Sequence, residues 1–249
     1  MKKTLLVLIS LLIWLVLGTI TIFVTIPIIL YTLFFWWLDP SRLLQHRLAT
    51  FWAFLVSWLN PFWSIEIHGL RHFSKKSTYI AVSNHSSLAD IIILYLLNRD
   101  FKWLSKESIF KIPFLGWGMR SCGYISLERG AHGSIRDSFE KALEWLRRGV
   151  SVMIFPEGTR SREGKLGAFR NGAFKLALKA KKPVLPIIIL GSTHMLEKGN
   201  WIMAGKIFIR VHVLDPIDVM PYEPEHFEKL RDKTRELMAG KISELSKCS

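Results

Sequence analysis

The chain has 249 residues, of which 50% are hydrophobic and 22% are charged. This composition excludes an intrinsically disordered chain, which needs few apolar residues. The formal net charge of +14 favours an anionic partner: a membrane surface, a phosphorylated substrate or nucleic acid. The two cysteines, Cys122 and Cys248, are too few for the disulfide framework of a small secreted protein.

The N-terminal segment is apolar and uncharged from Thr4 to Leu38. One upright bilayer span needs about 20 residues, and a secretory signal has an apolar core of about 7–15. This segment fits neither, so we expect a retained membrane element. Pro27 is expected to divide it, because proline removes a helical hydrogen bond.

A second apolar segment follows from Leu43 to Trp63 and is rich in aromatic residues, as is the end of the first. Such rings favour the headgroup level of a membrane, although a buried helical hairpin would show the same pattern. Lys2 and Lys3 place the N-terminus on the cytoplasmic side. Residues 67–249 carry +12 of the net charge, which also favours the cytoplasmic side for them. A two-helix anchor that enters and leaves the membrane on that side places both the N-terminus and these residues there. We therefore expect residues 1–63 to anchor the chain to the cytoplasmic face of the inner membrane.

Residues 64–249 are expected to form one α/β domain. Seven short apolar segments are predicted as strands: Ser64–His68, Thr78–Ser83, Phe101–Ser105, Gly123–Leu127, Ser151–Phe155, Val184–Leu190 and Lys206–Val213. Amphipathic helical patterns lie between several of them, and a last one covers Phe227 to Ile242. Strands that alternate with helices predict a mainly parallel sheet with helices on its faces.

One polar loop, Asn84 to Asp90, follows the predicted strand that ends at Ser83. A helix is expected to begin near Ser87, and one helical turn would bring the Asp90 carboxylate back to His85. A histidine held by a carboxylate is oriented as a general base. The same residues also fit a capping box of Ser87 with Asp90 and a structural histidine.

The second polar loop, Phe155 to Ser161, follows another predicted strand. Arg160 offers a planar fork for phosphate. Gly158 allows close approach of the backbone, and Thr159 can donate a further hydrogen bond. Glu157 can orient Arg160 or a substrate hydroxyl. Taken alone, this loop also fits a β-turn with a surface arginine.

Together the two loops resemble motifs of the glycerolipid acyltransferases, and in particular of the bacterial lysophosphatidate acyltransferases. The motifs are Asn84-His85-x-Ser-x-x-Asp90 and Phe155-Pro-Glu-Gly-Thr-Arg-Ser161. The resemblance runs from Tyr79 to Leu190 and includes the segment from Lys106 to Arg129. It departs from the family pattern at Glu128, where aspartate is frequent, and this change keeps the charge.

The resemblance implies acyl transfer from a thioester to the 2-hydroxyl of 1-acyl-glycerol-3-phosphate, which makes phosphatidate. His85 would act as the base, and Asp90 would hold its ring. Arg160, Lys106 and Arg129 would bind the glycerol phosphate, although Lys106 also fits a surface lysine and Arg129 a turn residue. A backbone N–H near the start of the Ser87 helix is a candidate oxyanion donor.

Neither a metal nor a resident cofactor is expected, and acyl-carrier protein or acyl-coenzyme A would be the co-substrate. The motifs equally serve another lysolipid or glycerol phosphate as the acceptor. A non-enzymatic module that binds anionic lipid is a further alternative, but it does not need His85 and Asp90 at a fixed spacing. No DNA- or RNA-binding motif accompanies the positive charge, so membrane lipids are the expected partner rather than nucleic acid.

Overall fold

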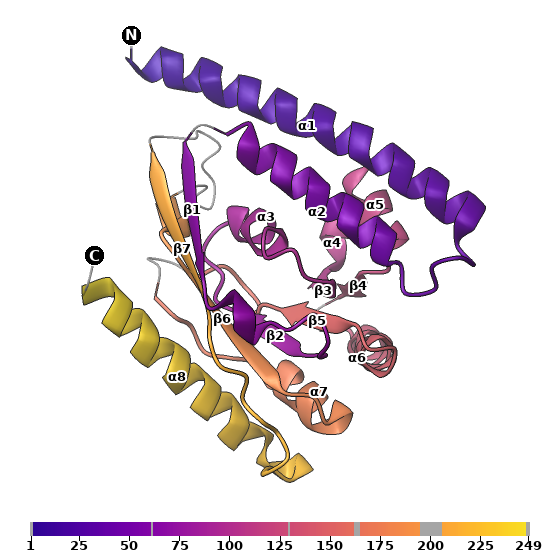
Figure 1. Cartoon of the computed structure of the whole chain (residues 1–249), viewed down its shortest axis with the longest axis vertical. Helices are drawn as coiled ribbons and strands as arrows, with labels where there is room; N and C mark the ends of the chain where they lie inside the picture. The colour runs from indigo at the N-terminus through magenta and orange to yellow at the C-terminus, as the bar shows by residue number, and fades with distance from the viewer. Residues whose placement is uncertain (1, 61, 129, 162–164, 195–205, 248–249) are drawn as a thin grey trace.

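Seven strands form one mixed sheet in the order β1-β7-β6-β2-β5-β3-β4 in the computed structural model, which describes residues 2–60, 62–128, 130–161, 165–194 and 206–247 (Figure 1). The strands are β1 (Trp63–His68), β2 (Ile80–Ser83), β3 (Phe101–Lys106), β4 (Ile125–Leu127), β5 (Ser151–Ile154), β6 (Val184–Leu190) and β7 (Ile207–Val213). All seven predicted strands are confirmed, and their ends differ from the prediction by two residues at most.

The helices are α1 (Lys2–Phe35), α2 (Leu43–Trp58), α3 (Ala89–Tyr95), α4 (Glu107–Phe110), α5 (Leu115–Ser121), α6 (His132–Arg147), α7 (Gly172–Ala180) and α8 (Phe227–Lys247). They cover both faces of the sheet, with α1, α2 and α3 on one side and α6, α7 and α8 on the other (Figure 1). The expected α/β class, a mainly parallel sheet flanked by helices, is confirmed.

Alternate residues of the central strands supply the two cores. In β2, Ala81 packs under α1 and α2, while Ile80 and Val82 pack against the other helical layer. This alternation follows from the two-residue period of a strand. Since both faces are covered, β2, β5 and all but the last residue of β6 are buried, as is typical of parallel strands.

The four strands β2, β5, β3 and β4 run parallel and lie side by side in that order. Their carboxyl ends therefore meet at one edge of the sheet, where α/β proteins commonly place their ligands. The strand β6 also runs parallel to β2, while β7 pairs with β6 in the antiparallel direction.

The N-terminal apolar segment forms a single helix, α1, so the expected division at Pro27 is wrong. Thr25 and Ile28, on either side of the proline, are both buried. Gly118 of α5 lies so close to Thr25 that a Cβ there would approach its Oγ1 to 3.2 Å. Packing against α5 therefore supports the helix across the position where the backbone donor is missing.

By length and composition, α1 can cross a membrane, and only 6% of its most apolar stretch is buried. The second helix, α2, is bound to the body of the protein by hydrogen bonds. The His46 Nε2–H donates to the Arg99 carbonyl at 2.9 Å, and His46 Nδ1 accepts from the Tyr124 hydroxyl at 2.8 Å. These two bonds hold α2 against the core beneath it.

A buried lysine of β3 attaches the turn between α1 and α2 to the sheet. The Lys102 ammonium donates to the carbonyls of Arg42, at 3.0 Å, and Cys122, at 2.8 Å. It also lies 4.7 Å from the centre of the Trp145 ring. Burial lowers the pKa of Lys102 from its ordinary value to about 8, because the charged form loses its hydration.

Candidate active site

His85 lies two residues beyond the end of β2, at the carboxyl edge of the sheet. Its Nδ1 atom is 2.8 Å from Oδ2 of Asp90, in the first turn of α3. Because a carboxylate can only accept, Nδ1 carries the hydrogen, and the lone pair is left on Nε2. Asp90 is fully buried and the His85 side chain is 13% exposed, so the pair is fixed while the ring still has an open edge.

The same oxygen of Asp90 also accepts from the backbone N–H groups of Ser86, at 2.7 Å, and Ser87, at 2.8 Å. Asp90 therefore holds both the histidine and the backbone that leads into the helix, while the N-cap residue Leu88 has no side-chain cap. Helix α3 begins at Ala89 rather than near Ser87. The N–H groups of Ser86 and Ser87 are engaged by Asp90, so an oxyanion donor near the helix start would have to be another N–H group.

Glu157 joins the two loops. Its Oε1 accepts the backbone N–H of His85 at 3.0 Å, and its Oε2 accepts the N–H of Gly167 at 2.8 Å. Burial raises the pKa of the Glu157 carboxyl, and the two N–H donors oppose that rise. Glu157 therefore holds the His85 backbone, and the expected contact with Arg160 is not found among the described residues. The contact of Glu157 with a substrate hydroxyl stays a prediction.

The next residues of this loop have different surroundings. Gly158 has a φ of +72°, and a Cβ there would lie 2.5 Å from Nε of Arg170, so glycine is required by the protein's own packing. Thr159 is exposed, and within the described ranges its hydroxyl donates to the Arg160 carbonyl alone, at 3.5 Å. The Arg160 guanidinium makes no hydrogen bond or ion pair with the other described residues.

Two further expected phosphate-binding residues follow β3 and β4. Lys106 ends β3 with an exposed side chain, at the same edge as His85 and Arg160. It has no ion pair or hydrogen bond within the described part of the chain. Arg129, two residues beyond β4, lies outside the described residues.

Sequence reasoning gave no role to Asn84. Its side chain is buried, donates from Nδ2 to the Ile189 carbonyl and accepts the Ile189 N–H at Oδ1, both at 2.8 Å. This pair of bonds joins the end of β2 to β6, next to His85. An amide that makes two bonds to one residue of a neighbouring strand has no local sequence pattern, so only the sheet order reveals it.

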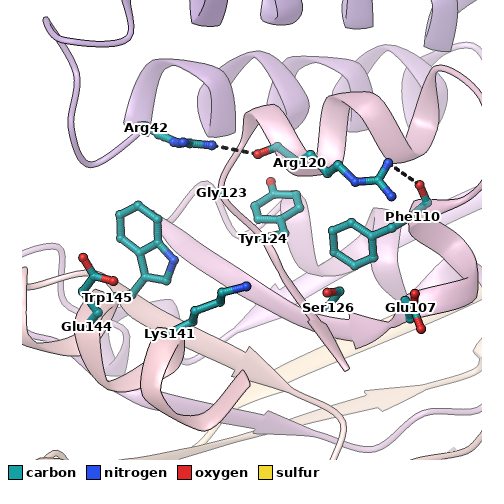
Figure 2. A pocket seen from close by; sticks show the side chains of 10 residues that line it. All are labelled: Arg42, Glu107, Phe110, Arg120, Gly123, Tyr124, Ser126, Lys141, Glu144 and Trp145. Atoms are coloured by element: carbon teal, nitrogen blue, oxygen red, sulfur yellow. Dashed lines mark hydrogen bonds between the residues drawn. The ribbon is translucent and has the colours of Figure 1, made fainter. Parts of the chain in front are cut away.

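A pocket of about 430 Å³ opens beside β4, and His85 is not one of the residues that line it (Figure 2). Arg42, Arg120 and Lys141 border it, together with the rings of Trp145 and Phe110. Two of these cations donate to backbone: Arg42 to the Arg120 carbonyl at 2.8 Å, and Arg120 to the Phe110 carbonyl at 2.6 Å. Glu107, which also lines the pocket, directly follows Lys106.

The family model Acyltransferase matches residues 64–190, the part of the chain that holds both loops. The chain belongs to the Acyltransferase family. Within this acyltransferase, no group of three or more histidine, cysteine, aspartate or glutamate residues in the described ranges is arranged to hold a metal ion.

Relatives of this acyltransferase include a chloroplastic 1-acyl-sn-glycerol-3-phosphate acyltransferase, LPAT1, from Arabidopsis thaliana. It is 38% identical over 181 residues, which are 72% of this chain and 50% of the relative. A 1-acyl-sn-glycerol-3-phosphate acyltransferase from Borreliella burgdorferi is 31% identical over 169 residues, which are 67% of this chain and 68% of that one. The chain thus spans about half the length of the plant relative.

A solved structure has the same fold over nearly the whole acyltransferase chain. It is the crystal structure of the 1-acyl-sn-glycerophosphate (LPA) acyltransferase PlsC from Thermotoga maritima, with a TM-score of 0.77 and 25% sequence identity. The match covers 99% of this chain and 98% of that one, so it includes the N-terminal helices as well as the sheet.

Proposed function

We propose that the protein transfers an acyl chain from a thioester to the 2-hydroxyl of 1-acyl-glycerol-3-phosphate and so makes phosphatidate. The contact between His85 and the buried Asp90 carries this proposal, because it leaves a basic nitrogen at the edge of the sheet. The relatives named for this activity support the choice of acceptor.

In the proposed reaction, His85 Nε2 removes the proton of the 2-hydroxyl as that oxygen attacks the thioester carbonyl. The imidazolium that forms is stabilised by Asp90. Collapse of the tetrahedral intermediate breaks the C–S bond, and the imidazolium returns its proton to the leaving sulfur. The products are phosphatidate and a free thiol, and His85 is neutral again. Holding both substrates at the base can contribute about 7–11 kcal/mol of the reduction in barrier.

We propose that Arg160 and Lys106, with Arg129, bind the phosphate of the acceptor. The two described cations follow neighbouring strands, β5 and β3, and have no partner among the described residues. Gly158 and Thr159 complete the loop that carries Arg160. An arginine fork and a lysine point charge are both common phosphate ligands in proteins.

Residues 1–63 serve in this proposal as a membrane anchor, and residues 64–249 as the catalytic domain on the cytoplasmic face of the inner membrane. Exposed apolar side chains along α1, and exposed Phe51, Phe54 and Trp58 on α2, support contact with lipid. Acyl-carrier protein or acyl-coenzyme A supplies the acyl chain. The core beneath α1 and α2 includes residues of α3, the helix that carries Asp90, which supports an approach of the acyl chain from the membrane side.

The test is to incubate the purified protein in liposomes with lysophosphatidate and an acyl thioester, and to follow phosphatidate and released thiol together. We expect both products in equal amounts and a loss of at least about 100-fold in His85→Ala. His226→Ala changes a histidine directly before α8, which packs on the other side of the sheet, and should keep full activity. Thiol without phosphatidate, or a diacyl product formed only when another lysolipid is supplied, would change the acceptor. Binding of anionic liposomes without any turnover would favour the lipid-binding module and refute acyl transfer.

A further inference from the structure

The imidazole of His85 lies flat against an aromatic ring from the second loop. Its centroid is 3.9 Å from that of Phe155, and the ring planes differ by 12°. Phe155 directly follows β5 and precedes Pro156 and Glu157 of the loop. The contact is as close as ring stacking allows, and it covers one face of the imidazole.

Phe155 is itself held in place by the core. Its other neighbour is the ring of Trp103, with centroids 5.4 Å apart and planes 27° apart. Trp103 is 2% exposed and packs edge-on against Tyr95 and Phe101. The order of rings is therefore Trp103, Phe155, His85, from the buried interior toward the open edge of the site. Phe155 cannot turn away from the imidazole without displacing the core.

The imidazole is thus fixed on two sides. Asp90 binds it in the plane of the ring at Nδ1, and Phe155 supports it from one face. An aromatic face carries partial negative charge and attracts a cation, with a gain that increases when water is excluded. The catalytic cycle proposed above converts a neutral imidazole into an imidazolium at this position.

We infer that Phe155 is a positioning residue that orients His85 and stabilises its protonated form through the face of the phenyl ring. This inference rests on the proposed function and adds to it a second source of stabilisation besides Asp90. Phe155 would contact neither substrate. A leucine could fill much the same space, so the distinctive contribution of phenylalanine is its ring.

Other charged groups near His85 are unchanged by a substitution at position 155. Asp90 on α3 binds Nδ1, and Glu157, on the same loop as Phe155, binds the backbone N–H of His85. Arg160 is five residues further along that loop. A change in pH dependence with these three groups in place would therefore report on the ring contact.

The experiment compares Phe155→Leu and Phe155→Met, which lack the ring, with Phe155→Tyr, which keeps it. In the two ring-less variants we expect kcat to fall by about 3- to 30-fold with the KM for lysophosphatidate unchanged. The acidic limb of the kcat/KM profile should move to lower pH by roughly 0.5–1.5 units. Phe155→Tyr should keep the wild-type kcat, and the acidic limb of its kcat/KM profile should stay at the wild-type pH.

Phe174→Leu is a matched control, because Phe174 is fully buried and stacks on Phe169 in the other core, with ring planes 12° apart. It should lower the thermal stability without moving the pH profile. NMR titration of the His85 ring signals, identified by their absence in His85→Ala, gives a second readout that needs no turnover. The midpoint should fall in the ring-less variants.

The inference would be overturned if the variants without the ring fold and keep two wild-type values: the pH of the acidic limb of kcat/KM and the titration midpoint of His85. An equal shift in Phe155→Tyr would also overturn it, because the effect would then come from packing and not from the ring. An inactive wild-type protein would instead refute the proposed function, while the titration midpoints would still decide whether the phenyl ring stabilises the imidazolium.

Discussion

The carboxyl edge of the sheet has two parts that differ in how their polar groups are held. Around His85, the side chains of Asn84 and Asp90, beyond β2, and of Glu157, just beyond β5, are buried and bonded to backbone or to His85. Beyond β5 and β3, Arg160 and Lys106 reach the surface without a partner among the described residues. One part is fixed before any ligand arrives, and the other is left free for one.

This difference fits the tasks proposed for the two parts. A general base must be held in one orientation, since a small misplacement of a reacting group can cost a large factor in rate. A phosphate is bound through charge-assisted hydrogen bonds that form only in the complex. A cation already paired within the protein would have to break that pair first. The cations without a partner are therefore suited to binding phosphate, and the bonded groups are suited to holding the base for the chemical step.

The largest effect is expected for Asp90→Asn, which alters the group that holds His85. The amide has one acceptor, whereas three donors now converge on a single Asp90 oxygen, and its NH₂ group can face the Nδ1–H of His85. We expect kcat to fall by roughly 10²- to 10⁴-fold, with the KM for lysophosphatidate within about 3-fold of wild type. Steady-state kinetics checks both values. Asp137→Asn, on the exposed side of α6, should be neutral. An Asp90→Asn enzyme with more than about a tenth of the wild-type kcat would show that the pair is not needed.

The second prediction concerns the free cations. Arg160→Ala should raise the KM for lysophosphatidate by about 10- to 100-fold, because a charge-assisted bond to the phosphate contributes about 1.5–3 kcal/mol. The acidic limb of the pH profile should not move. The matched control is Arg147→Ala, an exposed arginine on α6. If kcat fell while KM stayed constant, Arg160 would belong to the fixed part of the site.

The smallest effect is expected at Lys102, which contrasts with Lys106 on the same strand. Lys102 is buried with a lowered pKa, so the unfolded chain binds more protons than the folded one between about pH 8 and the ordinary lysine value of 10.5. Stability therefore rises with pH in this window. Relative to Lys102→Met, the wild type should gain about 3 kcal/mol or less across it. Denaturant unfolding in detergent at several pH values checks this. An equal pH dependence in both proteins would contradict the burial of a charge at Lys102.

Much of this architecture can be predicted from the sequence. The strands were predictable because each is a short apolar run, and β6 from Val184 to Leu190 has the predicted ends. The position of His85 after one strand and Arg160 after another also follows from the chain. The order of the strands does not, because β2, β5 and β3 become neighbours only through crossovers.

The features that the sequence pattern did not reveal depend on the contacts that each residue makes in the folded chain. Glu157 was expected to act on Arg160 or substrate, three residues away or outside the chain, yet it binds the backbone of His85. At the start of α3, Asp90 accepts the N–H groups of Ser86 and Ser87, which removes two of the backbone groups near the predicted helix start as oxyanion donors. At Pro27 a local rule was outweighed by packing against α5. The local sequence pattern thus located the two loops of the candidate site, while tertiary contacts determined which groups their side chains bind.

The bonds between Asn84 and Ile189 also constrain the order in which the protein can mature. They join positions 105 residues apart, and the bond from His85 to Glu157 spans 72. During synthesis the chain emerges from its N-terminus, so α1 and α2 are made long before β6. The loop of His85 cannot be locked until the strand that carries Ile189 has been made. The nascent chain can therefore reach the lipid surface through its first helices while the site is still unformed, and it becomes competent only when β6 docks against β2.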